Sequence, residues 1–115
     1  MHSMRQRALP SGTLDRTLVA LADPTRRMLI ERIGRKRQRA SDLCRGLPMS
    51  RPAVSRHLRV LREAGLVAAA PEGREMKYRL AHPQRLAEVR RYVDRISQFW
   101  DTALDAFKRY AEKTP

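Results

Sequence analysis

Residues 50–65, SRPAVSRHLRVLREAG, predict a helix with a recognisable signal at each end. Ser50 is a good N-cap, and Pro52 follows it in the first turn, where the N–H that proline lacks has no partner inside the helix. Gly65 stands where a C-terminal cap belongs, because glycine readily adopts the left-handed conformation that ends many helices. The segment between the two caps is therefore expected to form a helix of about 14 residues.

The two sides of this predicted helix differ in chemistry. At about 100° per residue, Val54, Leu58 and Leu61 fall within about 60° of each other and define the buried side. The free side carries mostly hydrogen-bond donors; its members are Pro52, Ser55, Arg56, Arg59 and Glu63, with Arg51 and Arg62 on the flank. None of these arginines has an acidic residue four positions before it, so no pair within the helix neutralises them.

Three shorter helices are predicted before residue 50. The expected elements are a helix over 13–22, a second helix that begins after the N-cap Asp23 and ends at Gly34, a polar connection over 35–39, and a third helix over 41–47. The turn Pro48-Met49-Ser50 joins the third helix to the helix over 50–65. Two short helices joined by a tight turn, the second with arginine and serine on its free side, are typical of a protein that reads the major groove of DNA.

A β-hairpin is predicted after Gly65, with strands over 66–70 and 76–80 and a turn over 71–74. The second strand alternates in polarity, which directs apolar side chains to one face and basic side chains to the other. The inward set is Met76, Tyr78 and Leu80, and the outward set is Lys77 and Arg79. The outward face and the hairpin tip are therefore free to meet phosphate groups.

Composition excludes several classes of protein. A chain of 115 residues suits one compact domain rather than a two-domain enzyme, and with 5% aromatic residues its core must rest on aliphatic side chains. The net charge is +13. Residues 26–62 carry 12 basic and two acidic residues, whereas 83–115 carry seven and five. This concentration of positive charge indicates a polyanionic partner, with nucleic acid favoured over an anionic membrane surface.

Cysteine usage and hydropathy indicate a cytoplasmic protein. Cys44 is the only cysteine, so no internal disulfide can form. The longest near-apolar stretch, 66–71, is far shorter than the roughly 20 residues that span a bilayer, and 1–12 lacks an apolar signal core. We expect no membrane partner, and we expect 1–12 to be a flexible segment without a functional role.

A long helix is predicted from about Pro83 onward. Its apolar residues recur at alternating steps of three and four, at Leu86, Val89, Val93, Ile96, Trp100, Ala103, Phe107 and Tyr110. Such a heptad spacing indicates a seam packed against another long helix, and no other predicted helix of the chain has a matching length. Packing on its own domain is the alternative, but self-association explains the seam more simply.

The order of these elements resembles that of the ArsR/SmtB family of bacterial winged helix-turn-helix repressors. The residues that carry the resemblance are 21–27 (LADPTRR), 50–58 (SRPAVSRHL), 61–67 (LREAGLV) and 73–80 (GREMKYRL). The resemblance covers roughly residues 13–110. It implies a mainly helical fold with a small β-hairpin, and a homodimer joined by the first and last helices that binds a palindromic operator in successive major grooves.

The resemblance and the residue chemistry together give the expected sites. The DNA-binding set comprises Ser50, Arg51, Pro52, Ser55, Arg56, His57, Arg59, Arg74 and Lys77. The dimer set comprises Leu14, Leu18, Val89, Val93, Ile96, Trp100, Ala103 and Phe107. We expect residues 13–82 to form the winged DNA-binding domain and 83–115 the dimerisation helix of the same compact unit. The chain would then be a bacterial regulator that joins the nucleoid when it binds DNA.

The metal-sensing motifs of the family are incomplete in this sequence. The resemblance places a Leu-Cys-Val-Cys core on the third helix of arsenic and cadmium sensors, but here Cys44 matches the first cysteine and Gly46 replaces the second. Zinc and cobalt sensors use Asp and His on the last helix, yet 84–115 contains no histidine. A lone thiolate or scattered carboxylates make a poor site, so we expect neither a metal nor another cofactor.

Two alternatives to a simple repressor stay open at this point. The first is a repressor released by a small molecule, by thiol oxidation or by an unexpected metal, and its effector is unknown. The second is a binder that is indifferent to nucleic-acid sequence; the lack of Phe, Tyr and Trp in 26–62 disfavours single-strand binding. We do not expect an enzyme, because no nucleophile-base pair, paired-carboxylate motif or Gly-rich phosphate loop occurs.

Overall fold

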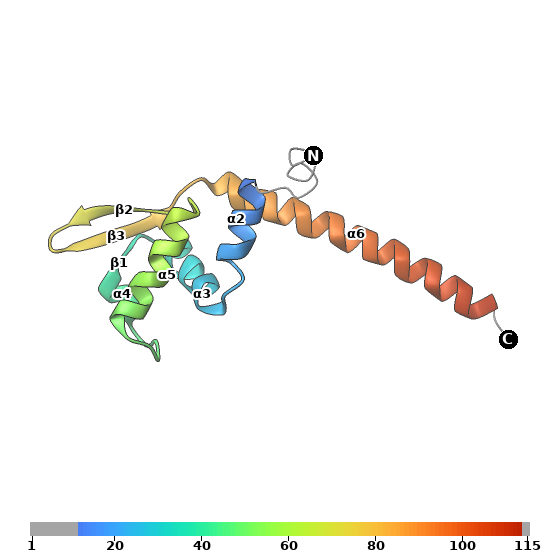
Figure 1. Ribbon diagram of the computed structural model, residues 1–115, viewed down its shortest axis with the longest axis horizontal. Coiled ribbons are helices and arrows are strands. Elements are labelled where there is room, and N and C mark those ends of the chain that lie inside the picture. Colours follow the sequence, from blue (N-terminus) through green and yellow to red (C-terminus); the bar gives the residue numbers. More distant parts are fainter. Residues whose placement is uncertain (1–11, 114–115) are drawn as a thin grey trace, which may run out of the picture.

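The computed structural model describes residues 12–113 (Figure 1). The elements in chain order are α2 (Thr13–Ala20), α3 (Pro24–Arg35), β1 (Gln38–Arg39), α4 (Ala40–Cys44), α5 (Arg51–Glu63), β2 (Val67–Glu72), β3 (Glu75–Leu80) and α6 (Pro83–Lys113). The expected fold class is confirmed, since helices dominate and the strands form one small antiparallel sheet. The expected segment 1–12 lies, apart from Gly12, outside the described residues.

The core forms where α3, α4, α5 and the sheet meet. Leu29, Leu43, Leu58 and Leu61 are each at most 1% exposed, and they belong to one cluster of buried side chains. The predicted inward side of α5 is confirmed, because Val54 is also 1% exposed. Burial of this aliphatic side fixes which side of α5 faces outward.

Two predicted N-caps are confirmed. The Asp23 carboxylate accepts hydrogen bonds from the backbone N–H groups of Thr25 (2.7 Å) and Arg26 (3.1 Å), with Pro24 as the first helical residue. The Ser50 hydroxyl accepts one from the N–H of Ala53 at 3.3 Å. Each side chain satisfies donors that the first turn of a helix leaves without a partner, so the starts of α3 and α5 are fixed locally.

Several predicted boundaries were wrong. α3 continues through Gly34 to Arg35, because Gly34 keeps a helical conformation and the chain turns extended only at Lys36. The third helix ends at Cys44 rather than at residue 47, since the chain extends at Arg45 and Gly46 takes a positive φ of 79°. α2 ends at Ala20, two residues before its predicted end.

The connection over 35–39 contains a strand that the sequence did not reveal. Gln38 and Arg39 form β1 and pair with Tyr78 and Lys77 of β3. The sheet order is β1-β3-β2, so β3 is the central strand. β1 is too short and too polar to carry an alternation signal, and its pairing depends on a strand about 40 residues later.

The hairpin turn is shorter than predicted. Glu72 pairs with Glu75, which leaves only Gly73 and Arg74 in the turn, and Gly73 takes a φ of 64° that glycine tolerates. Pro71 lies inside β2 rather than in the turn, as an edge strand permits. The predicted inward face of β3 is confirmed, because Tyr78 is 8% exposed while Met76 and Leu80 pack against the core.

α6 has 31 residues and none of them is buried. At 1.5 Å per residue the helix is about 46 Å long. Figure 1 shows it leaving the domain as an extended rod, with α2 beside its first turns. Among residues 12–113, no helix is both long and apolar enough to cross a membrane.

Candidate nucleic-acid interface

The outward side of α5 presents arginine side chains without partners. Ser55, Arg56 and Arg59 are exposed, as the pattern predicted. Within residues 12–113, neither Arg56 nor Arg59 has a hydrogen bond or ion pair to another side chain or to the backbone. Both guanidinium groups are therefore available for phosphate oxygens or for the O6 and N7 atoms of guanine.

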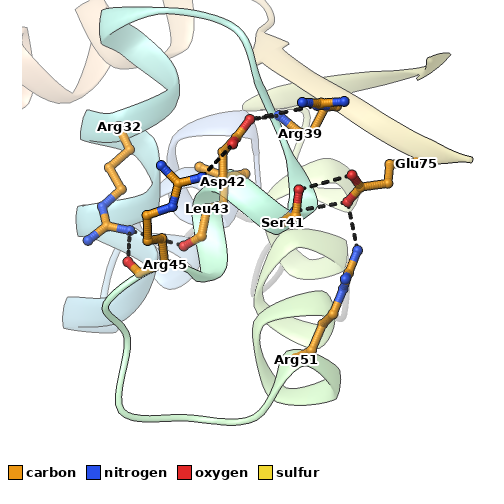
Figure 2. A network of polar contacts seen from close by, with 8 residues as sticks. All are labelled: Arg32, Arg39, Ser41, Asp42, Leu43, Arg45, Arg51 and Glu75. Carbon is orange, nitrogen blue, oxygen red and sulfur yellow. Dashed lines mark hydrogen bonds and ion pairs between the residues drawn. The ribbon is translucent and has the colours of Figure 1, made fainter. Parts of the chain in front are cut away.

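Two other predicted DNA-binding residues of α5 already have structural partners. Ser50 uses its hydroxyl as the N-cap described above. Arg51, the first residue of α5, donates from Nη2 to Glu75 Oε1 at 2.7 Å (Figure 2). Pro52 lies exposed in the first turn. The N-terminal end of α5 is thus tied to the wing, the hairpin formed by β2 and β3.

Glu75 ties the wing to α4 as well as to α5. Its carboxylate accepts from the Ser41 backbone N–H at 3.0 Å and from the Ser41 hydroxyl at 2.9 Å (Figure 2). The hydrogen bonds from Ser41, followed by the hydrogen bond and charge of Arg51, lower the pKa of Glu75 below its ordinary value. The carboxylate is therefore held in its charged form between both helices of the helix-turn-helix.

Side chains also fix the two ends of α4 (Figure 2). At its start, Asp42 accepts from the Arg39 backbone N–H at 3.3 Å and pairs with the side chains of Arg39 and Arg45. At its end, Arg32 of α3 donates to the carbonyl oxygens of Leu43 (3.1 Å) and Arg45 (2.9 Å). A helix of five residues is not stable alone, so these contacts and the burial of Leu43 hold it in place.

His57 faces the corner between α2 and α3 rather than the outer side of α5. Its Nδ1 lies 3.3 Å from Arg26 Nη1. The Arg26 guanidinium also donates to the carbonyl oxygens of Ala20 (2.5 Å) and Val19 (3.3 Å) at the end of α2. The ring of His57 therefore has a partner within the domain, and its expected contact with DNA stays a prediction.

The other end of α5 is capped by a side chain of α6. Arg85 donates from Nη1 to the carbonyl oxygen of Ala64, and its guanidinium lies directly over Gly65. Gly65 has a φ of 80°, and a Cβ there would collide with Arg85. The predicted glycine cap is confirmed, because the positive φ of Gly65 is a conformation that favours glycine.

The wing carries the remaining predicted DNA-binding residues. Arg74 is exposed in the two-residue turn at the hairpin tip. Lys77 lies on β3, where its Nζ is 3.3 Å from Glu72 Oε2. This exposed pair contributes little to stability, so Lys77 can exchange Glu72 for a phosphate.

The predicted dimer residues lie on α2 and along α6. Leu14 and Leu18 are partly buried, as are Val89 and Ala103. The rest of the seam is open to solvent, with exposed fractions of 54% for Val93, 39% for Ile96, 56% for Trp100 and 69% for Phe107. A monomer therefore leaves a long apolar strip uncovered, a feature that marks an interaction surface.

A groove of about 540 Å³ lies between α2 and the second half of α5. Its lining includes the apolar residues Val19, Ala20, Val60 and Ala64 and the charged residues Asp15, Arg16 and Glu63. Val19, one of these apolar residues, is 68% exposed. The groove adds to the apolar surface that α2 leaves uncovered.

No group of three or more His, Cys, Asp or Glu side chains comes together as a metal site anywhere in residues 12–113. Cys44 is a free, partly buried thiol at the end of α4. The structure thus adds no ligand to the incomplete motif seen in the sequence.

Sequence reasoning missed three residues that hold the recognition helix. Arg26, Glu75 and Arg85 contact α5 near its middle, its start and its end. Each lies more than 20 residues from its partner along the chain, so no local sequence pattern predicts the contact. Glu75 gave no clear signal, because it is one of two acidic residues in a predicted hairpin that also carries three basic residues.

A helix-turn-helix with a basic recognition helix and a β-hairpin wing defines a DNA-binding protein of the winged helix-turn-helix class. Residues 23–69 match the family described as "Bacterial regulatory protein, arsR family". The HTH-type transcriptional regulator Rv2034 of Mycobacterium tuberculosis is 45% identical over 93 residues, which cover 81% of this chain and 83% of that protein. The chain belongs to the ArsR/SmtB family of transcriptional regulators.

Two further relatives agree with this assignment. The ArsR-like transcriptional regulator from Rhodococcus sp. RHA1 superposes with a TM-score of 0.63 at 39% identity, covering 86% of this chain and 92% of that one. The HTH-type transcriptional repressor SmtB of Mycobacterium tuberculosis is 38% identical over 64 residues, which cover 56% of this chain and 47% of that protein. The protein is a transcriptional regulator of a DNA-binding repressor class, not an enzyme.

Proposed function

We propose that the protein is a homodimeric repressor that binds a palindromic operator in a sequence-specific manner. The observation that carries this proposal is the outward side of α5, where Arg56 and Arg59 are exposed and have no partner within residues 12–113. The helix itself is held at its start, middle and end by Glu75, Arg26 and Arg85. Free donors on a fixed helix are what base reading in the major groove requires.

The wing supplies sequence-independent contacts in this proposal. Arg74 at the hairpin tip and Lys77 on β3 contact phosphates on either side of the groove that receives α5. The excess of basic residues over 26–62 steers the protein to DNA and makes its affinity depend on salt. The protein acts in the cytoplasm, on the nucleoid.

In this proposal the seam of α6 is the surface through which two copies of the chain pair. Val93, Ile96, Trp100 and Phe107 lie on one side of the helix, and each is at least 39% exposed. When two copies pair through their α6 seams, each covers the apolar strip of the other, and the apolar surface of α2 lies alongside. Both chains then make the same contacts, as a two-fold interface requires. The pairing places two α5 helices for the two half-sites of a palindrome.

The test is a comparison of operator with scrambled DNA. Duplexes are selected from a randomised pool with the purified full chain, and the selected and scrambled duplexes are titrated by fluorescence anisotropy at two salt concentrations. We expect a palindromic selected site and a preference of about a thousandfold or more. Equal affinity for both duplexes, falling steeply with salt, would instead show a charge-driven binder that reads no sequence.

A further inference from the structure

Arg51 stands at the position of α5 from which base contacts are made. In helix-turn-helix proteins, residues at the start of the recognition helix reach the base edges. The Arg51 side chain is 56% exposed, and within residues 12–113 its only hydrogen bond or ion pair is the one to Glu75. That contact uses Nη2, so the other N–H groups of the guanidinium remain free for a base or a phosphate.

Glu75 is much more firmly held than Arg51. Its side chain is 22% exposed, and its two oxygens accept the two hydrogen bonds from Ser41 as well as the one from Arg51 (Figure 2). Ser41 belongs to α4, whose ends are fixed by Asp42 and Arg32. Glu75 is therefore a fixed negative charge that reaches Arg51 from the wing.

We propose that Glu75 is a positioning residue that sets the base preference of the DNA site through Arg51. A long arginine side chain at the end of a helix can contact any nearby phosphate, which carries no sequence information. The Glu75 carboxylate restrains the guanidinium group at the start of α5 through the Nη2 contact, so that its free N–H groups meet one base pair rather than the backbone. The same carboxylate repels phosphates and weakens binding to DNA of any sequence.

Glu72 offers a matched control within the same hairpin. It faces Glu75 across the two-residue turn, carries the same charge, and is paired with Lys77 at 3.3 Å. No hydrogen bond or ion pair joins Glu72 to Arg51 or to Ser41 among the described residues. Glu72→Gln therefore repeats the change in charge made by Glu75→Gln, but releases Lys77 rather than Arg51.

The experiment compares base preferences in the full-length chain. Wild type, Glu75→Gln, Glu72→Gln and Arg51→Ala each select duplexes from the same randomised pool, and each is then titrated against the wild-type site and a scrambled duplex. We expect Glu75→Gln to lower the ratio of specific to scrambled affinity by about tenfold, within the range of one bidentate base contact. We also expect it to lose the preference at one base pair of each half-site, the same one that Arg51→Ala loses.

Two further variants keep the test decisive. Ser41→Ala removes one hydrogen bond from Glu75 without a change in charge, and we expect a smaller loss of preference at the same base pair. When Arg51→Ala is already present, adding Glu75→Gln should not change the base preference further. It should only raise the affinity for scrambled DNA, as Glu72→Gln also does, because each removes one negative charge. Thermal unfolding of each variant identifies any that fails to fold.

This inference rests on the proposed function, and the two fail in different ways. If wild type prefers no selected duplex over scrambled DNA, the proposed function fails. If wild type does have a preferred site, and Glu75→Gln keeps the base preferences of wild type or of Glu72→Gln, then Glu75 does not position Arg51. Tighter operator binding by Glu75→Gln with unchanged base preferences would likewise overturn the inference, since it would show that Glu75 only withholds Arg51 from DNA.

Discussion

The winged domain, here residues 23–80, and the distal half of α6 differ in how much of their apolar and polar surface is covered within one chain. In the winged domain, Leu29, Leu43 and Leu61 are fully buried, and polar side chains cap the helices. In the distal half of α6, Trp100 and Phe107 are more than half exposed and no residue is buried. The first region is complete within one chain, whereas the second needs a surface from outside the chain.

Replacing a leucine by alanine in each region should give the largest difference between the two regions, measured as the free energy of unfolding. Leu58→Ala opens a cavity in the core of the winged domain, where Leu58 is 1% exposed, and should reduce the free energy of unfolding by about 2–5 kcal/mol. Leu104→Ala removes the same atoms from a side chain of α6 that is 59% exposed in one chain, and should change the free energy of unfolding of the winged domain by less than about 1 kcal/mol. Urea unfolding followed by circular dichroism measures both, and equal losses would contradict the comparison.

Charges placed on the α6 seam should separate pairing from folding. Trp100→Glu with Phe107→Glu puts two carboxylates on the uncovered strip, so the dimer dissociation constant should rise on the order of 100-fold or more. The thermal transition of the winged domain should persist, because neither residue is part of its core.

Gln98→Glu with Thr102→Glu is the matched control, because it adds the same charge to exposed positions away from the seam. Analytical ultracentrifugation should show a dimer for this control and a monomer for the seam variant. Dissociation of both variants to the same extent would mean that the seam is not the pairing surface.

Loss of a single guanidinium should matter on α5 and not on α6. Arg56→Ala should weaken operator binding by about 1–3 kcal/mol and flatten the preference at one base pair, if Arg56 reads a base. Arg109→Ala removes the same charge from an exposed site near the end of α6 and should leave the preferences unchanged. Anisotropy titrations on operator and random duplexes decide the outcome, and an equal loss on both duplexes for Arg56→Ala would make Arg56 a phosphate contact.

Acid should have the smallest effect, confined to the winged domain. Hydrogen bonds from the backbone N–H groups of Arg26 and Thr25, and the charges of His57 and Arg26, lower the pKa of Asp23 from its ordinary value of 3.8. A lowered pKa adds stability that is complete above pH 3.8 and is lost as the pH falls through the folded-state value. Asp23→Asn should therefore lower the urea midpoint at pH 7 and show a smaller further decline than wild type between pH 5 and pH 3.

Asp101→Asn on α6 is the control for the acid experiment. Asp101 is exposed and has no hydrogen bond or ion pair within residues 12–113. Its urea midpoint should follow that of wild type at every pH. A decline with pH for Asp23→Asn as steep as that of wild type would show that the cap does not carry the acid dependence.

Local signals in the sequence predicted much of the fold. The caps Asp23 and Ser50 and the inward residues of α5 and β3 follow from spacing and side-chain chemistry within a few positions. β1 was missed because two polar residues become a strand only through β3. Gly34 was read as a helix end, although a glycine can also continue a helix at a cost of about 1 kcal/mol.

The candidate site was predictable only in part, for the same reason. The exposed side of α5 follows from helical periodicity, so Arg56 and Arg59 could be named in advance. The contacts of Arg26, Glu75 and Arg85 with α5 depend on how distant segments pack, so they cannot be predicted from the spacing of residues along the chain. These contacts decide how the recognition helix is held, which is why the structure was needed to find Glu75.

The decisive measurement is the solution mass of the unmodified chain by sedimentation equilibrium at micromolar concentration. If the winged domain is complete and α6 is a half-interface, the mass should be twice the chain mass of 13.3 kDa, and it should fall toward 13.3 kDa only on dilution. A folded species of 13.3 kDa across the whole concentration range would contradict the account, because the apolar strip of α6 would then stand uncovered in water.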